Sequence, residues 1–459
     1  MSESHTIQQP AQNKMGTMPI GRLLISMSLP MIISMLVQAM YNIIDSVFVA
    51  QISESALAAV SLAFPIQNLM IAVSSGTCVG VNALLSRSLG EGNPKQAHLA
   101  AVNGIFLAIL GALAFLLFGV FGAEAYFASQ TKDPEIILFG TQYLQIVGIF
   151  SFGIFGEMML ERILQSTGRT IYSMYSQGIG AITNIIFDPI LIFGLLGFPA
   201  MGIRGAAAAT VFGQILAMVI ALVLNHAKNH DVNISMRGFK PHGRTIKTIY
   251  AVGVPSIIMQ SIGSVMTYGL NLILISFSAT AVTVLGIYFK LQSFIFMPIF
   301  GLNNGMIPII AYNYGARSRK RIMDTAKLSI GIAVSIMLVG LALFQTIPDK
   351  LLMIFNASDQ LLEIGVPALR LISLSFLFAG YCIIVSSVFQ ALGNGVYSLI
   401  VSVARQLVCI LPLAYIFAQV WGLHAVWYSF PLAEIMSLTL STILFKRIYD
   451  KKIKILEVI

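Results

Sequence analysis

Twelve long apolar runs, separated by short polar segments, make up most of this 459-residue chain. A helix that crosses a bilayer needs about 20 consecutive and mostly apolar residues, and each run is that long. Backbone polar groups in lipid must be paired within their own element, and the runs are too long for barrel strands. The sequence therefore predicts an all-α integral membrane protein with twelve transmembrane helices, near residues 23–50, 57–83, 99–123, 138–164, 171–196, 203–225, 248–277, 280–308, 325–347, 362–390, 395–419 and 423–445.

The composition excludes several other classes of protein. Charged side chains make up 10% of the residues, whereas a soluble domain carries about 25%. The polar N-terminal segment lacks the apolar region and cleavage site of a signal peptide, so we expect the first apolar run to remain as a span. The three cysteines lie in apolar runs without a C-x-x-C pair, which indicates neither a disulfide framework nor a zinc site.

Basic residues gather in alternate loops and predict the orientation of the chain. The segment between the sixth and seventh spans alone contains Lys228, Arg237, Lys240, Arg244 and Lys247. The loops on the other side are mostly acidic. By the positive-inside rule, both termini are cytoplasmic in a multi-pass protein of the cell membrane. The net charge of +9 is explained by these loops, so we expect the lipid bilayer and no nucleic acid as a partner.

The two halves of the chain align at one fixed offset, which pairs Pro30 with Pro255. SLPMIISM at residues 28–35 aligns with GVPSIIMQ at 253–260, RSLGEG aligns with YNYGAR, and LQSTGR aligns with FQALGN. Three matches across six spans predict two pseudo-symmetric six-helix bundles with a binding cavity between them. The predicted organisation is a tail at 1–22, a bundle at 23–226, a linker at 227–247, a bundle at 248–445 and a tail at 446–459.

Acidic residues inside the predicted spans are few. They are Asp45, Glu157, Glu161 and Asp188 in the first half and Glu434 in the last span. A charge at the bilayer centre costs from about 2.5 kcal/mol upward, so such residues usually face a cavity or a partner. Helical rise places Asp45 and Asp188 in the outer half of the membrane and Glu161 nearer the cytoplasmic end. We expect two levels along a transport path; pairing for packing alone is the alternative for each acid.

Polar neighbours accompany two of these acids at helical spacing. Tyr41 precedes Asp45 by four residues, and Asn184 precedes Asp188 by four, so each helix would carry a narrow polar stripe. Pro189 removes a backbone donor directly after Asp188, which predicts a loosened helix there. Desolvation and mutual repulsion favour protonated carboxyls, so we expect a proton to bind near neutral pH and to compete with another cation.

Other chemistry-bearing patterns have simpler explanations. Lys290 and Arg405 in the second half are interpreted as snorkelling or structurally paired bases. His226 and His230 lack an HExxH motif or a third ligand, so they predict a loop and no metal. The segment LGEGNPK lacks the Walker lysine with its Ser or Thr, and no paired catalytic set lies in a span. We therefore expect neither an enzyme nor a bound cofactor.

These features together resemble the multidrug and toxic compound extrusion (MATE) transporters over about residues 20–445. The resemblance rests on five segments, which are SLPMIISMLVQAMYNIIDSVFVAQI, SRSLGEGNPKQA, LQSTGR, TNIIFDPILIFG and IPIIAYNYGAR. It is nearest to the DNA-damage-inducible F-like and staphylococcal-type exporters. It implies secondary active export of lipophilic, mostly cationic compounds, in exchange for protons or alternatively sodium, by alternating access of two bundles.

The resemblance also implies roles for individual residues. The cation-coupling residues would be Tyr41, Asp45, Asn184, Asp188 and Thr210. The substrate-binding residues would be Tyr41, Glu161, Gln165 and Asp188. Pro30 matches a family hinge, and we add Pro189 because it loosens its helix. No metal is assigned, although sodium could bind at Asp45, Asn184 and Asp188; the expected partners are drugs and organic cations, and the expected state is a monomer.

The sequence departs from the family at one site. Some relatives have a cation site of acids on spans seven and ten, but span seven here offers only Gln260 and Asn271, so that site is not expected in the second half.

Two alternatives remain beside the exporter. A flippase for lipid-linked precursors, from the same superfamily, would need a basic cavity that binds phosphate. A receptor without transport activity fits a two-fold repeat of twelve helices less well than alternating access does.

Overall fold

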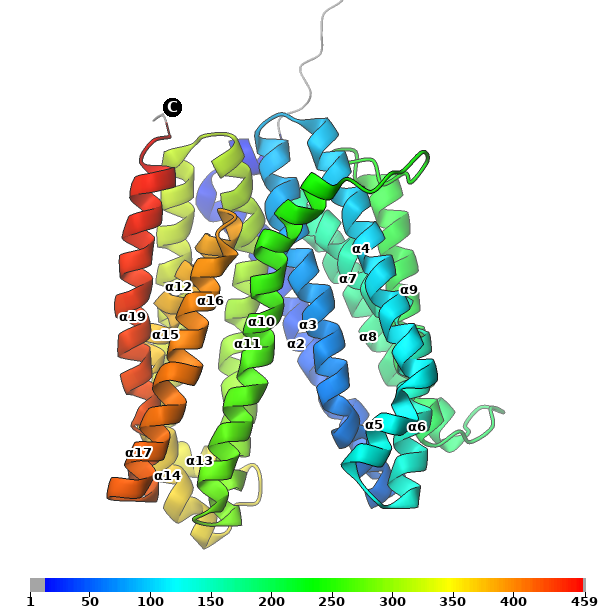
Figure 1. The fold of residues 1–459 in the computed structure, drawn as a ribbon, viewed down its shortest axis with the longest axis vertical. Helices are drawn as coiled ribbons and strands as arrows, with labels where there is room; N and C mark the ends of the chain where they lie inside the picture. The colour runs from blue at the N-terminus through cyan, green and yellow to red at the C-terminus, as the bar shows by residue number, and fades with distance from the viewer. Residues whose placement is uncertain (1–12, 457–459) are drawn as a thin grey trace, which may run out of the picture.

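The computed structural model describes residues 13–456, and its regular structure is helical throughout that range (Figure 1). Ten of the described helices are long and apolar enough to cross a membrane, or twelve spans result when each of two bent helix pairs counts as one. The predicted all-α membrane fold is confirmed.

The first half contains α2 (Ile20–Ala50), α3 (Glu54–Gly90), α4 (Pro94–Phe121), α6 (Pro134–Ile149), α7 (Phe152–Ser166), α8 (Thr170–Phe193) and α9 (Ile203–Lys228). The second half contains α10 (Gly243–Ile275), α11 (Ala279–Gly315), α12 (Arg319–Thr346), α14 (Asp359–Ser373), α15 (Phe376–Ala391), α16 (Gly395–Val403), η1 (Ala404–Ile410), α17 (Leu411–Trp421), α18 (Leu423–Val426), α19 (Ser429–Ile448) and η2 (Tyr449–Ile453). Three short helices are α1 (Lys14–Thr17), α5 (Ala123–Gln130) and α13 (Pro348–Met353).

The helices extend into segments that the sequence predicted as tails and linker. The predicted tail 1–22 contains α1 and the start of α2, and its residues 1–12 lie outside the described residues. The predicted tail 446–459 contains the end of α19 and all of η2, with 457–459 outside the described residues. The predicted linker begins in the last turn of α9 and ends in the first turn of α10.

Equivalent serines begin the second span of each half. The Ser53 hydroxyl accepts the backbone N–H of Ala56 at 3.0 Å, and the Ser278 hydroxyl accepts that of Ala281 at 3.1 Å. These N-caps satisfy backbone donors that the first helical turn leaves free. Ser53 and Ser278 are separated by the same number of residues as Pro30 and Pro255, so the internal repeat includes the N-cap of this helix.

Spans four and ten are bent at nearly equivalent positions. The pair α6 and α7 bends by 44° at Ser151, and the pair α14 and α15 bends by 50° at Ser375. The sequence predicted one continuous helix for each. No proline causes the break; the Ser151 hydroxyl donates to the Ala112 carbonyl at 2.9 Å, and the Ser375 hydroxyl donates to Ile372 at 2.7 Å. Ala112 belongs to α4, so the Ser151 bond joins the break to a neighbouring helix, whereas the Ser375 bond is local to its own span.

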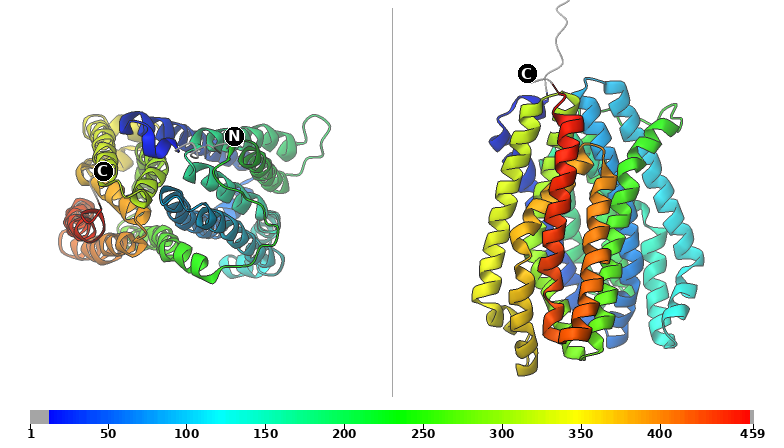
Figure 2. Two further views of the ribbon diagram at one scale, coloured as in Figure 1. Left: turned by 90° about the horizontal axis from the view of Figure 1, so that it is seen from above. Right: turned by 60° about the vertical axis from the view of Figure 1, so that its left-hand side comes forward.

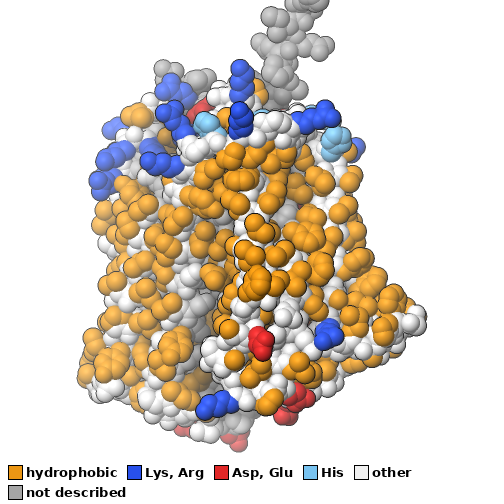
Figure 3. Space-filling view, turned by 45° about the vertical axis from the view of Figure 1, so that its right-hand side comes forward, with side chains coloured by type: hydrophobic (Ala, Val, Ile, Leu, Met, Phe, Trp, Pro, Cys, Tyr) orange, Lys and Arg blue, Asp and Glu red, His pale blue; other side chains and the backbone are white. Residues whose placement is uncertain are grey.

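The two halves stand side by side, with both described ends of the chain at the same end of the molecule (Figures 1 and 2). Figure 3 shows Lys and Arg gathered at that end, a broad hydrophobic band beyond it, and Asp and Glu toward the opposite end. We call the end that includes α1 and η2 the basic end. The main contacts between the halves are those of α2 with α11 and of α3 with α10.

Glycines that are equivalent in the repeat bring the halves together at the basic end. A Cβ atom added at Gly90 would overlap the carbonyl oxygen of Tyr312, and one at Gly315 would overlap that of Arg87. Only glycine permits such a close backbone approach. Two further pairs of equivalent glycines lie close to the other half. Gly76 and Gly80 each approach α10, and their equivalents Gly301 and Gly305 each approach α2.

We predict that Gly315→Ala destabilises the protein by about 1–3 kcal/mol, because the added methyl group forces the packed helices apart. Thermal unfolding of the purified protein in detergent measures the effect. Gly286→Ala is the matched control, since Gly286 lies on the same helix α11 and nothing lies within 4 Å of its added Cβ. Equal melting temperatures for the two variants would contradict the prediction.

Candidate functional site

A cavity of about 400 Å³ lies within the first half of the protein. Its walls come from α2, α3, α6, α7, α8 and α9, and Asn304 of α11 is the one lining residue from the second half. The sequence predicted a cavity between the two bundles, and that position stays a prediction. The first half has the polar side chains for a site, since the residues aligned with Asp45 and Asp188 are Leu270 and Leu413.

The walls of this cavity are largely apolar and flexible. Methionines from three helices line it, together with the Phe64 ring. Methionine side chains are unbranched and polarizable, so they adapt to ligands of different shape. The lining methionines are Met31, Met35, Met70 and Met158.

The predicted polar stripes of α2 and α8 both face the cavity. Gln38, Tyr41 and Asp45 line it from α2, and Gln177 and Asn184 line it from α8. The Gln177 amide donates to the Gln38 side-chain oxygen at 3.3 Å. Helical periodicity alone was sufficient to find these faces.

Asp188 is fully buried and, unlike Asp45, does not line the cavity. The two carboxyls are close enough to share a hydrogen bond. In the orientation that satisfies both partners, the Asn184 amide nitrogen donates to Asp188 at 3.1 Å. Its oxygen then accepts the Thr210 hydroxyl at 3.2 Å and the Thr210 backbone N–H at 3.0 Å. The five residues assigned to cation coupling thus lie together, while their roles remain predictions.

The residues of α7 form the other polar wall. Glu157, Glu161, Arg162 and Gln165 all line the cavity, although Glu161 is only 5% exposed. One Glu161 oxygen is buried without a hydrogen-bond partner among the described residues. The Gln165 amide donates to the Ser173 hydroxyl at 2.8 Å. The Gln165 side-chain oxygen is also buried without a partner among the described residues, so both Glu161 and Gln165 can accept a hydrogen bond from a ligand.

Several polar residues that line this cavity were not predicted from the sequence. Gln67 of α3 donates to the Tyr143 hydroxyl of α6 at 3.0 Å, and both side chains line the cavity. Arg162 donates to the Asn304 side-chain oxygen at 3.1 Å, across the two halves. A polar residue in an apolar run was the available signal, but it does not tell which helices meet.

The two proposed hinge prolines lie within unbroken helices. Pro30 is inside α2 and Pro189 is inside α8, which continues to Phe193. The loosening expected at Pro189 does not end the helix, because Gly194 terminates it in a left-handed conformation at φ 73°. A hinge concerns motion, so both assignments remain predictions.

The two bases predicted within spans of the second half make structural contacts, with Lys290 exposed and Arg405 only partly buried. The Arg405 guanidinium, within the π-helical segment η1, forms an ion pair with Glu434 at 3.2 Å. The Lys290 ammonium lies 5.8 Å from the centre of the Phe355 ring, a cation–π contact. In residues 13–456, no group of three or more His, Cys, Asp or Glu side chains is arranged to bind a metal ion.

A sequence model of the MatE family matches residues 30–190 and 255–416. The chain belongs to the MatE family. The two matched segments begin at Pro30 and Pro255, the same pair that defines the internal repeat. The chain is 26% identical over 416 residues to the multidrug export protein MepA of Staphylococcus haemolyticus, covering 90% of this chain and 91% of that protein. It is also 26% identical over 421 residues to MepA of Staphylococcus aureus, covering 91% of each.

A solved structure has the same fold as this MatE family member. It is described as the outward-facing conformation of a multidrug resistance MATE family transporter, and it superimposes with a TM-score of 0.90 at 24% identity. The match covers 97% of this chain and 100% of that one. MatE family proteins are transporters and not enzymes, so this chain is a multi-pass membrane transporter.

We predict that Asn184→Ala lowers the free energy of unfolding by about 1–3 kcal/mol, because it leaves the buried Asp188 and Thr210 groups without partners. Denaturation of the detergent-solubilised protein measures this loss. Asn42→Ala is the matched control, because Asn42 is an exposed asparagine that lines the same cavity. An equal loss in the two variants would contradict the hydrogen-bond network described above.

Proposed function

We propose that the protein is a secondary active efflux transporter that exports lipophilic, mostly cationic compounds by antiport with protons. The observation that carries the proposal is the position of Asp45, which opens onto an apolar cavity with the buried Asp188 within hydrogen-bonding reach of it. The name of the MepA relatives, multidrug export protein, supports the same activity. The proposal needs no cofactor, and both bundles belong to one chain, so a monomer suffices.

The charge distribution supports an orientation for this transport. Lys and Arg gather at the basic end, which the positive-inside rule places in the cytoplasm together with both termini (Figure 3). The glycine pairs bring the halves together at that same end. We infer that this conformation is closed toward the cytoplasm.

The paired carboxyls offer a means of coupling. Two carboxyls within hydrogen-bonding reach are not both ionised without strong repulsion, so they tend to hold one proton between them. A cationic substrate beside Asp45 would favour the ionised pair and expel that proton. Substrate and proton would therefore occupy the site alternately.

The hydrogen bonds of Asn184 favour the proton over sodium as the coupling ion. Sodium at this site would use oxygens of Asp45, Asp188 and Asn184. The Asn184 oxygen already accepts two hydrogen bonds from Thr210, and its nitrogen faces Asp188. Both ends of the Asn184 amide are therefore engaged without a metal ion, which supports proton coupling.

The lining also separates the exporter from the flippase alternative. Three acids line the cavity, Asp45, Glu157 and Glu161, whereas Arg162 is the one base in the lining and is engaged by Asn304. Apolar cations suit acidic groups among methionine and aromatic side chains. A phosphate-bearing lipid precursor would be repelled by the same groups. The site therefore favours organic cations.

We predict that Asp188→Asn removes proton-driven export of a fluorescent organic cation, because the amide neither binds nor releases a proton. Proteoliposomes with imposed proton and sodium gradients, tested separately, measure the export rate. Asp349→Asn, an exposed change in the short helix α13, is the control and should export at the wild-type rate. Wild-type export by Asp188→Asn under the proton gradient would overturn the proposal, and export driven by sodium alone would overturn its choice of ion.

We also predict that Glu161→Gln raises the concentration of cation needed for half-maximal export, because it removes a buried negative charge from the cavity wall. A neutral dye of similar size should show no such increase. The comparison of both dyes in the same proteoliposomes tests whether the side chain selects charge. Equal changes for the two dyes would indicate that Glu161 acts only in packing.

A further inference from the structure

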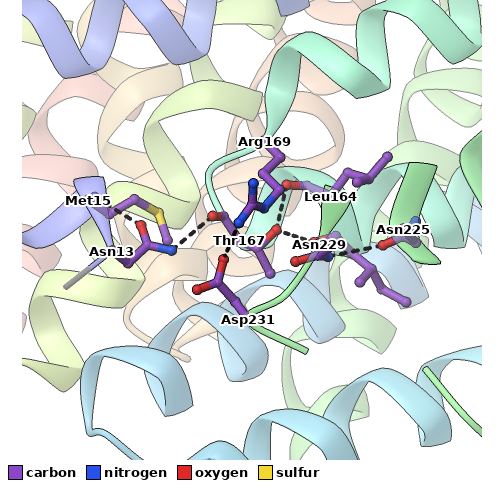
Figure 4. A network of polar contacts seen from close by, with 9 residues as sticks. Asn13, Met15, Leu164, Thr167, Arg169, Asn225, Asn229 and Asp231 are labelled. Atoms are coloured by element: carbon purple, nitrogen blue, oxygen red, sulfur yellow. Dashed lines mark hydrogen bonds and ion pairs between the residues drawn. The ribbon is translucent and has the colours of Figure 1, made fainter. Parts of the chain in front are cut away.

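The N-terminal residues 13–18, which we call the clip, lie across both halves of the protein at the basic end. The Asn13 amide donates to the Thr167 carbonyl of the first half at 3.0 Å (Figure 4). Lys14 is partly buried, and this burial together with the nearby Arg169 charge lowers the pKa of its ammonium group. The chain then continues directly into α2.

The middle of the clip is bound by the second half. Arg321 donates to the Met15 carbonyl at 2.9 Å and to the Met18 carbonyl at 2.8 Å. Asn313 donates to the same Met15 carbonyl at 3.0 Å and accepts from Arg321 at 3.0 Å. These bonds use backbone acceptors that a four-residue helix cannot pair internally.

Apolar packing accompanies the polar contacts. The Met15 side chain has no exposed surface and belongs to the hydrophobic core of the second half. Leu23, Leu24 and Met27 at the start of α2 belong to the same core. Gly16 lies against the Tyr312 ring, 3.0 Å from its added Cβ, so a larger residue would disturb the contact. The first half therefore extends a segment into the core of the second.

These contacts occur at the end where the glycine pairs join the halves. The clip is bonded to both halves, so separating the halves there requires it to leave either Arg321 and Asn313 or Thr167. We propose that the clip is a latch, which holds the basic ends of the two bundles together and must release one of these two sets of contacts before that end opens. This inference rests on the alternating access of the proposed function, but its test requires no transport.

A cysteine at position 28 can report the opening. Ser28 is 3% exposed, and its hydroxyl donates to the Leu302 carbonyl of α11 at 3.3 Å, so it lies between the halves at the basic end. Ser28→Cys would be placed in a chain whose native cysteines, Cys78, Cys382 and Cys409, are replaced by serine. The rate of labelling by a charged maleimide, measured on the full chain in detergent micelles, then follows exposure of this interface.

We expect Arg321→Ala to label position 28 several-fold faster than the parent chain, and Asn313→Ala to do so to a smaller extent. Arg319→Ala is the matched control, because Arg319 is a neighbouring arginine on α12 whose side chain contacts Tyr449 within the second half. It should label at the parent rate. Arg321→Lys should resemble Arg321→Ala, since lysine cannot reach two carbonyls with one planar group.

Parent-like labelling of both Arg321→Ala and Asn313→Ala would overturn the latch. Thermal unfolding of each variant identifies a change caused by unfolding; if Arg321→Ala does not fold, the labelling rate of Asn313→Ala decides. If the parent chain does not export the cation but the Arg321→Ala and Asn313→Ala variants label faster, the proposed function is rejected and the latch is retained. Normal export with unchanged labelling would reject the latch alone.

Discussion

An ionised carboxyl surrounded by apolar groups is unstable unless something compensates for it, and this constraint explains how the first half is built. Asp188 is fully buried, yet it is not isolated, because Asn184 and Asp45 surround its carboxyl. Thr210 in turn holds Asn184. The helices that contribute these groups, α2, α8 and α9, must pack in a register that brings the four side chains together.

The two halves share a scaffold but not its chemistry. Serine caps and interface glycines recur at one offset, and the bent spans recur close to it, so backbone geometry is common to both. The acids and their polar partners occur only in the first half, whereas the corresponding positions in the second are occupied by residues such as Leu270. The second half supplies a packing surface, and its own buried acid, Glu434, is occupied by Arg405.

Much of the fold was predictable because it depends on local periodicity. The spans, the stripes of Tyr41 with Asp45 and Asn184 with Asp188, and the repeat all follow from spacing along the chain. The bends at Ser151 and Ser375 were missed because no proline stands at either break. The contacts of Arg162 and of the clip were missed because they depend on which helices meet in space.

The enclosure of the cavity by one bundle has a consequence for motion. If the first bundle turned as a rigid body, Asp188 would travel with its whole environment, and its contact with water would be the same before and after. Rigid-body rotation of the two halves would then change the side to which the substrate has access, but it would not release a proton from Asp188. For Asp188 to meet solvent, α2 has to slide or bend relative to α8. The transport cycle would therefore include a conformational change within the first half.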